Sequence, residues 1–239
     1  MTISNATPNE LELMHYERLN TGTTKTKNAE LEKNGFIVLE DLWDSEELYH
    51  PVPQQRGQIN YWGTVEQFNH SEENPDVPGS LSRYNHPQYR RIFSSIRKKV
   101  EDVVGRKVYK TYFYDQYFFP DQKVLKHINR DVSEIIIELL ISTNLKEDWP
   151  LHIKTPDTYT DKSKSAVLVP GEERIIELKP GTGILYKGCE RPVWRDPMPG
   201  AKQKNKIFGK AEEVYYHQIH LSYVLADGER SHCADDMSN

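Results

Sequence analysis

The sequence has few cysteines and no long apolar run, and each of these absences excludes a class of protein. Its two cysteines, Cys189 and Cys233, are too few and too far apart for a disulfide scaffold or a thiolate metal site. The longest apolar stretch, residues 135–141, contains a glutamate and falls far short of the roughly 20 apolar residues that span a bilayer. Residues 1–25 lack the apolar core of a secretory signal. We therefore expect a cytoplasmic protein with reduced thiols and no membrane partner.

The sequence also lacks an excess of positive charge and several common catalytic motifs. Its 31 lysines and arginines stand against 36 aspartates and glutamates, and the resulting net charge of −5 argues against nucleic acid as a partner. Neither a phosphate-binding loop, nor a GxSxG elbow, nor an HExxH helix is present. Nucleotide hydrolysis, elbow-type hydrolysis and helical zinc proteolysis are therefore not indicated.

What the sequence does contain is a helical beginning followed by many short apolar segments. Residues 28–39 read as a short helix, a turn and a strand, and the three-to-four spacing of apolar residues across 88–105 predicts an amphipathic helix. Residues 71–87 are rich in turn-forming residues and predict a surface loop. From residue 108 onward, β-favouring segments separated by turn signals predict an antiparallel sandwich or jelly roll with helices on one face.

His127 is the histidine whose setting best suits metal binding. On a strand, His127 and Asn129 point to the same face because they are two residues apart. A histidine followed at the second place by an aspartate would open the two-histidine, one-carboxylate triad that binds ferrous iron. Here the second place is an asparagine.

Several segments resemble the Fe(II)/2-oxoglutarate-dependent oxygenase superfamily, in particular its prolyl 4-hydroxylase-like, marine and phage-type members. Residues 120–127 (PDQKVLKH) resemble the P-G-Q-K-x-x-x-H approach to the first iron ligand. Residues 179–186 (KPGTGILY) look like the P-G-D-x-x-x-Y strand, and residues 188–196 (GCERPVWRD) look like the G-C-E-x-x-H-W-R-E segment that carries the distal histidine. Residues 218–228 are similar to the closing strand, so the resemblance covers residues 107–228.

The resemblance implies a fold and a domain organisation. The fold is mainly β with some α: a double-stranded β-helix, or jelly roll, with N-terminal helices packed on one face. We expect a flexible N-terminal arm at residues 1–27, one jelly-roll domain at residues 28–228 and a C-terminal tail at residues 229–239.

The resemblance also assigns the three metal-ligand positions, to His127, Asn129 and Val193, which together form a degenerate facial triad. Asparagine offers a neutral carbonyl oxygen in place of an anion, and valine has no lone pair. Fe(II) and 2-oxoglutarate are the cofactors that the resemblance implies. With Asn129 and Val193 at two ligand positions, however, the site has fewer metal donors and no carboxylate to balance the charge of the metal. The cation that binds 2-oxoglutarate in the family falls near a run of lysines here, at positions 202, 204 and 206.

Further side chains are candidates for lining a pocket. The three tyrosines of residues 112–117 are predicted to share one strand face, and the glutamine and histidine at 218 and 220 another. Relocated metal donors are sought among His152, Gln218, His220 and Glu190. No catalytic residue is assigned. The pocket candidates are Tyr112, Tyr114, Tyr117, Arg130, His152, Tyr186, Trp194, Arg195, Gln218 and His220.

Three functional hypotheses follow. The first is a pseudoenzyme candidate, a divergent superfamily member that has lost the standard iron centre and keeps a pocket for a small molecule or peptide, with binding alone or metal-independent chemistry. The second is an active 2-oxoglutarate-dependent dioxygenase, a hydroxylase that uses His127 and a relocated ligand. The third is a scaffold partner of an active relative. The sequence leaves the oligomeric state open.

Overall fold

The computed structural model describes residues 24–44, 47, 69–70, 77, 80–86, 89–160, 167–200 and 214–235. Within these ranges the chain consists mainly of antiparallel strands with few helices. No helix in the described part of the chain is long and apolar enough to cross a bilayer. The prediction of a mainly β chain is confirmed.

The larger of two facing sheets, which we call the major sheet, has seven strands within the described ranges. Its central strands pair in a continuous antiparallel ladder, with β13 hydrogen-bonded to β4 on one side and to β6 on the other. The strand order across the sheet is β1 (Phe36–Leu39), β11 (Gly183–Lys187), β6 (Ile135–Thr143), β13 (Tyr216–Leu225), β4 (Val108–Phe118), β3 (Leu81–Tyr84) and β2 (Asn69–His70).

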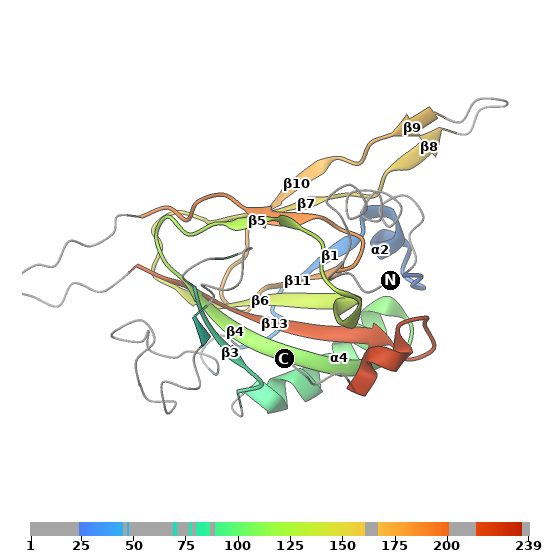
Figure 1. Ribbon diagram of the computed structural model, residues 1–239, viewed down its shortest axis with the longest axis horizontal. Helices are drawn as coiled ribbons and strands as arrows, with labels where there is room; N and C mark the ends of the chain where they lie inside the picture. Colours follow the sequence, from blue (N-terminus) through green and yellow to red (C-terminus); the bar gives the residue numbers. More distant parts are fainter. Residues whose placement is uncertain are drawn as a thin grey trace, which may run out of the picture.

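The smaller sheet, which we call the minor sheet, has four strands in the described ranges and lies opposite the major sheet (Figure 1). Its order is β10 (Glu173–Ile176), β7 (Leu151–Lys154), β12 (Val193–Arg195) and β5 (Val124–His127). A separate hairpin of β8 (Thr158–Thr160) and β9 (Val167–Val169) projects beyond it. Successive strands from β4 to β13 alternate between the two sheets, apart from this hairpin and the β7–β10 pair, and this winding is that of a jelly roll.

Two α-helices flank the strands in the described part of the chain. Helix α2 (Ala29–Asn34) begins where the Asn28 side chain accepts hydrogen bonds from two backbone N–H groups, and it ends at Gly35, whose φ of 78° is left-handed. Helix α4 (Arg90–Val104) buries one apolar stripe and lies against the outer face of the major sheet (Figure 1). Both elements were predicted from the sequence. Two short 3-10 helices, η5 (Asp131–Ser133) and η6 (Ser231–Asp235), complete the described elements.

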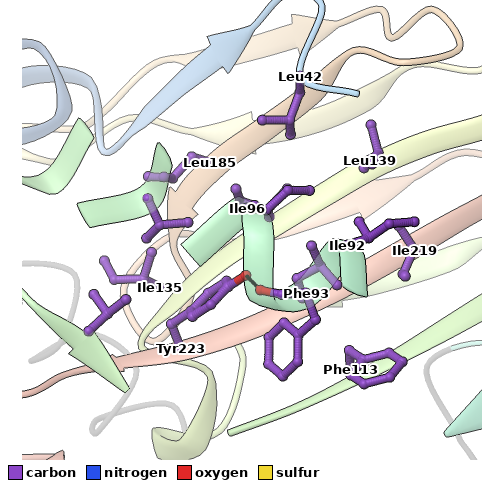
Figure 2. Close-up of a cluster of buried hydrophobic side chains, with 14 of the residues drawn as sticks. Leu42, Ile92, Phe93, Ile96, Phe113, Ile135, Leu139, Leu185, Ile219 and Tyr223 are labelled. Carbon is purple, nitrogen blue, oxygen red and sulfur yellow. Dashed lines mark hydrogen bonds between the residues drawn. The ribbon is translucent and has the colours of Figure 1, made fainter. Parts of the chain in front are cut away.

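Side-chain alternation divides the apolar residues of the major sheet between two cores. Ile137 and Leu139 on β6 face α4, where they join the outer core. Figure 2 shows Leu139 within this core. Ile136 and Leu140 on the same strand face the minor sheet, where they pack with Ile153 in the inner core. Because side chains alternate along a strand, each other residue of β6 can be assigned either to the face that contacts α4 or to the face that contacts the minor sheet.

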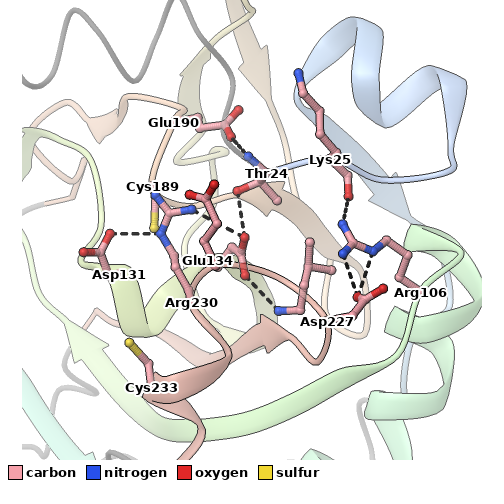
Figure 3. A network of polar contacts seen from close by, with 12 residues as sticks. Thr24, Lys25, Arg106, Asp131, Glu134, Cys189, Glu190, Asp227, Arg230 and Cys233 are labelled. Atoms are coloured by element: carbon pink, nitrogen blue, oxygen red, sulfur yellow. Dashed lines mark hydrogen bonds and ion pairs between the residues drawn. The ribbon is translucent and has the colours of Figure 1, made fainter.

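The chain before α2 and the chain after β13 are both bonded to the domain (Figure 3). Thr24 donates a hydrogen bond from its backbone N–H to Glu190 and from its hydroxyl to Glu134, at 3.2 Å. Arg230 donates to Asp131 at 3.0 Å and lies 3.5 Å from Glu134. Thr24 and Arg230 thus contact the packed strands, although they lie in the expected arm and tail. The domain boundaries stay a prediction, because residues 1–23 and 236–239 lie outside the described ranges.

The expectation of a surface loop at residues 71–87 is also corrected. Residues 81–84 form strand β3. Arg83 on this strand is buried, and its charge is balanced by an ion pair with Asp115. The sequence did not predict this strand because turn-forming residues surround it. The strand forms because it pairs with β4, and this tertiary contact outweighs the local preference for turns.

We predict that the outer core carries much of the stability. Replacing Ile137, which is 0% exposed, by alanine should lower the free energy of unfolding by about 2 to 5 kcal/mol, because a cavity forms beneath α4. Ile175 on β10 is 60% exposed, and the matched Ile175→Ala change should cost less than about 0.5 kcal/mol. Urea denaturation measures both. Equal losses for the two variants would contradict the assignment of the core.

Candidate functional site

Two of the three assigned ligand positions lie directly opposite each other. Strands β5 and β12 pair antiparallel, with His127 as the partner of Val193. Val193 is buried in the inner core, whereas His127 is half-buried at the end of its strand. The pairing brings together two segments separated by more than sixty residues, as the resemblance requires.

His127 keeps one ring nitrogen available for a ligand. Its Nδ1 atom lies 2.8 Å from the carbonyl oxygen of Leu125. A carbonyl can only accept, so Nδ1 donates the hydrogen bond, and in the neutral ring the lone pair lies on Nε2. Metal-binding histidines are oriented in this way.

Asn129, at the third position, is used as a hydrogen-bond donor. Its backbone N–H donates to Gly188 at 2.9 Å, and its side-chain Nδ2 donates to the Tyr186 hydroxyl at 3.4 Å. The Tyr186 hydroxyl in turn donates to Glu138 Oε1 at 2.8 Å. Burial and the neighbouring Glu138 carboxylate raise the pKa of Tyr186 well above its usual value, so the phenol stays protonated.

These residues do not fit a ferrous ion at the three assigned positions. His127 supplies one imidazole, Asn129 supplies a neutral amide whose nitrogen is already donating, and Val193 supplies no donor. Ferrous centres of this type use two imidazoles and a carboxylate. No group of three histidine, cysteine or acidic side chains within the described ranges is arranged to hold a metal ion.

A row of polar side chains crosses the inner face of the major sheet beside His127. Glu138 on β6 is paired with His220 on β13, and His220 is paired with Tyr114 on β4. The rings of His220 and Tyr114 are nearly parallel, with centroids 4.8 Å apart. The flanking residues Ile219 and Leu221 face α4, so His220 faces the minor sheet.

His220 is neutral at physiological pH. The side chain is 3% exposed, and burial is the main cause that lowers its pKa from 6.5 to about 4. The Glu138 carboxylate opposes this shift, while His127 reinforces it. Within the described part of the chain, His220 Nε2 has no hydrogen-bond partner in the protein.

Arg195 brings a positive charge into the interior from the minor sheet. One terminal nitrogen donates to the carbonyl of Trp149, and the other lies 3.3 Å from Gln218 Oε1 and 3.7 Å from Glu138 Oε2. The guanidinium also lies 4.9 Å from the ring centroids of Trp149 and Tyr216. Arg195 is 2% exposed, so it forms with Glu138 a buried ion pair that joins the two sheets.

A 2-oxoglutarate carboxylate therefore does not find an unengaged guanidinium in Arg195. Its two terminal nitrogens contact protein oxygens, and the charge of Glu138 already balances its own. The lysines at positions 202, 204 and 206 lie outside the described residues.

Most of the remaining pocket candidates do face the interior. Tyr112 lies 6.2 Å from Tyr114 between ring centroids and shares a hydrogen bond of 3.0 Å with Ser133. Arg130 lies over the Tyr112 ring, 5.7 Å from its centroid. The candidates that the structure brings to the inner face or its edge are Tyr112, Tyr114, Arg130, Tyr186, Arg195, Gln218 and His220.

Tyr117 lies on the opposite face of β4, which corrects the prediction that it shares a face with Tyr114. Three residues separate the two tyrosines, and alternation has a period of two. The Tyr117 ring stacks on His217 at 3.8 Å, where His217 Nε2 lies 2.9 Å from Asp115. This buried polar cluster faces away from the minor sheet.

His152 and Trp194 lie on the outer face of the minor sheet. Their neighbours Ile153 and Val193 belong to the inner core, so alternation turns His152 and Trp194 outward. The two rings stack 5.3 Å apart, and His152 Nδ1 lies 2.7 Å from Glu173. Neither side chain lines the interior.

Glu138 is the interior residue that the sequence analysis missed. The signal was a single carboxylate within the apolar run of β6, because a buried carboxylate requires a partner. The partner, Arg195, lies on the other sheet and cannot be identified from spacing along the chain.

Comparisons with known proteins identify the fold. No protein-family model and no curated protein sequence matches this chain. The non-heme alpha ketoglutarate dependent carbocyclase SnoK from nogalamycin biosynthesis is 9% identical, with a TM-score of 0.56 over 95% of this chain and 87% of that one. A prolyl hydroxylase from Trichoplax adhaerens, in complex with a hypoxia inducible factor peptide, is 13% identical, with a TM-score of 0.53 over 95% and 97%.

A third similar structure is that of EctD from S. alaskensis with 2-oxoglutarate and 5-hydroxyectoine. It is 15% identical, with a TM-score of 0.51 over 83% of this chain and 74% of that one. At these identities the likeness concerns the fold alone. The chain has the jelly-roll fold found in Fe(II)/2-oxoglutarate oxygenases, and the predicted fold resemblance is confirmed.

We predict that His220 makes stability depend on pH. Its folded pKa of about 4 is lower than its ordinary value of 6.5, so the unfolded chain takes up a proton first as the pH falls. Stability should therefore decrease below pH 6.5, by about 3 kcal/mol at pH 4 relative to a non-ionisable His220→Gln variant. Denaturation at each pH measures this loss. The exposed residue His232 provides the control variant His232→Gln, and identical pH profiles for all three proteins would contradict the burial of His220.

Proposed function

We propose that this chain binds a small molecule in the interior of its jelly roll without the three-residue ferrous centre of the oxygenases that share its fold. The observation that carries the proposal is the pairing of His127 with Val193. An isopropyl group directly opposite the remaining imidazole removes a metal donor and fills its position with apolar atoms.

The interior charges support the same function. Glu138 and Arg195 neutralise each other across the two sheets, at 3.7 Å. A ferrous centre with a dicarboxylate co-substrate would instead need protein donors around the metal and a cation for the far carboxylate. The described interior offers a self-contained ion pair, which suits ligand binding or metal-independent chemistry.

The rival function is an active dioxygenase that recruits a relocated donor. His220 is the residue that favours it, because its Nε2 atom has no hydrogen-bond partner among the described residues and the neighbouring His127 helps to lower its pKa. The other relocated donors considered are less suitable: Gln218 accepts a bond from Arg195, His152 faces outward, and Glu190 bonds to Thr24.

Anaerobic titration with ferrous iron and 2-oxoglutarate separates the two functions. We expect no stoichiometric iron binding, no metal-to-ligand absorption band and no succinate after oxygen is admitted. Iron binding at one equivalent together with succinate release would establish the rival function and reject the proposal.

A variant that carries the missing carboxylate and the missing second histidine provides a matched comparison with the parent protein. The double variant Asn129→Asp with Val193→His should bind ferrous iron, because it sets two imidazoles and a carboxylate at the positions around His127. Equilibrium dialysis should show at least about tenfold tighter binding than the parent, about 1.4 kcal/mol. If the double variant folds and its iron affinity equals that of the parent, the assignment of these positions is wrong.

A further inference from the structure

Three buried polar atoms in the interior lack hydrogen-bond partners within the described part of the protein: Glu138 Oε2, His220 Nε2 and Arg195 Nε. Glu138 and His220 are direct neighbours across the β6–β13 pair, and Arg195 reaches Glu138 from the minor sheet. Buried polar atoms are nearly always paired with protein, water or a ligand, and one bound molecule could pair with all three of these atoms.

The chemistry of the three atoms is complementary. A carboxylate oxygen of Glu138 accepts, the Nε–H group of Arg195 donates, and neutral His220 accepts on Nε2 when its other nitrogen carries the proton. A primary carboxamide matches this set, because its carbonyl accepts one hydrogen bond and its NH2 group donates two.

The charges of the site disfavour the two ligand groups that most resemble a carboxamide in shape, a carboxylate and an amidinium. The charges of Glu138 and Arg195 cancel, so a neutral ligand leaves the interior neutral. A carboxylate would bring an uncompensated negative charge beside Glu138, and an amidinium would bring a positive charge beside Arg195. Burying either charge is costly.

We propose that Glu138, His220 and Arg195 form a binding site for a small neutral molecule that carries a primary carboxamide. This inference rests on the proposed function, since it requires a ligand in an interior without iron. The near-parallel rings of Tyr112 and Tyr114 beside His220 favour a ligand in which the carboxamide is attached to an aromatic ring.

Three probes of the same shape test the inference: benzamide, benzoate and benzamidine, which differ in charge and in hydrogen-bonding pattern. Isothermal titration calorimetry of the full chain in the presence of a metal chelator should show benzamide as the tightest ligand. We expect a preference of at least about tenfold, or about 1.4 kcal/mol, over each charged probe. Ring-nitrogen NMR signals of His220 should shift on addition of benzamide.

The variant Glu138→Gln should reverse the preference. It leaves the charge of Arg195 unbalanced, so benzoate should become the tightest of the three probes. Glu173→Gln is the matched control, because Glu173 lies on the exposed edge strand beside His152, and it should keep the order of the parent. If Glu138→Gln does not fold, His220→Phe serves instead and should weaken benzamide binding by about tenfold, about 1.4 kcal/mol.

Three results would overturn the inference: benzoate binding to the parent as tightly as benzamide, an unchanged order in Glu138→Gln, or no binding of any probe. Each is independent of the iron titration. A chain that binds neither iron nor benzamide would retain the proposed function and lose this ligand, whereas a chain that binds iron with succinate release would lose the proposed function itself.

Discussion

The ion pair between Glu138 and Arg195 links the two sheets through the interior of the jelly roll. Glu138 comes from the middle of β6 and Arg195 from the end of β12, and their closest atoms are 3.7 Å apart. Each would be costly to bury alone, so their positions constrain each other. Tyr186 donates a hydrogen bond to Glu138, and Gln218 accepts one from Arg195.

The same constraint organises the candidate site. Tyr186 bonds to Glu138, and Asn129 bonds to Tyr186, so the position that resembles a metal carboxylate is tied to the interior ion pair. The β5–β12 pairing then sets Val193 against His127. The strands keep the geometry of the jelly roll, with Asn129 hydrogen-bonded to Tyr186 and Val193 packed in the inner core.

The sequence predicted the features that depend on local periodicity. The apolar stripe of α4 and the period-two strands of the second half were readable. The resemblance assigned ligand positions to His127 and Val193, and the structure shows that these two residues lie on paired strands. Features that depend on tertiary contacts were not readable. Strand β3 is stabilised by pairing with β4, and the opposite faces of Tyr114 and Tyr117 follow from a spacing that was misjudged. In the sequence, Glu138 appears only as one charged residue within the apolar run of β6. Its role could not be predicted, because its partner Arg195 lies on the other sheet.

Anomalous diffraction at the iron absorption edge tests the account most directly. Crystals grown without oxygen, in the presence of ferrous iron and 2-oxoglutarate, should show no iron peak between His127 and Val193, and Glu138 should remain paired with Arg195. A fully occupied iron peak within bonding distance of His127 Nε2 would contradict the account.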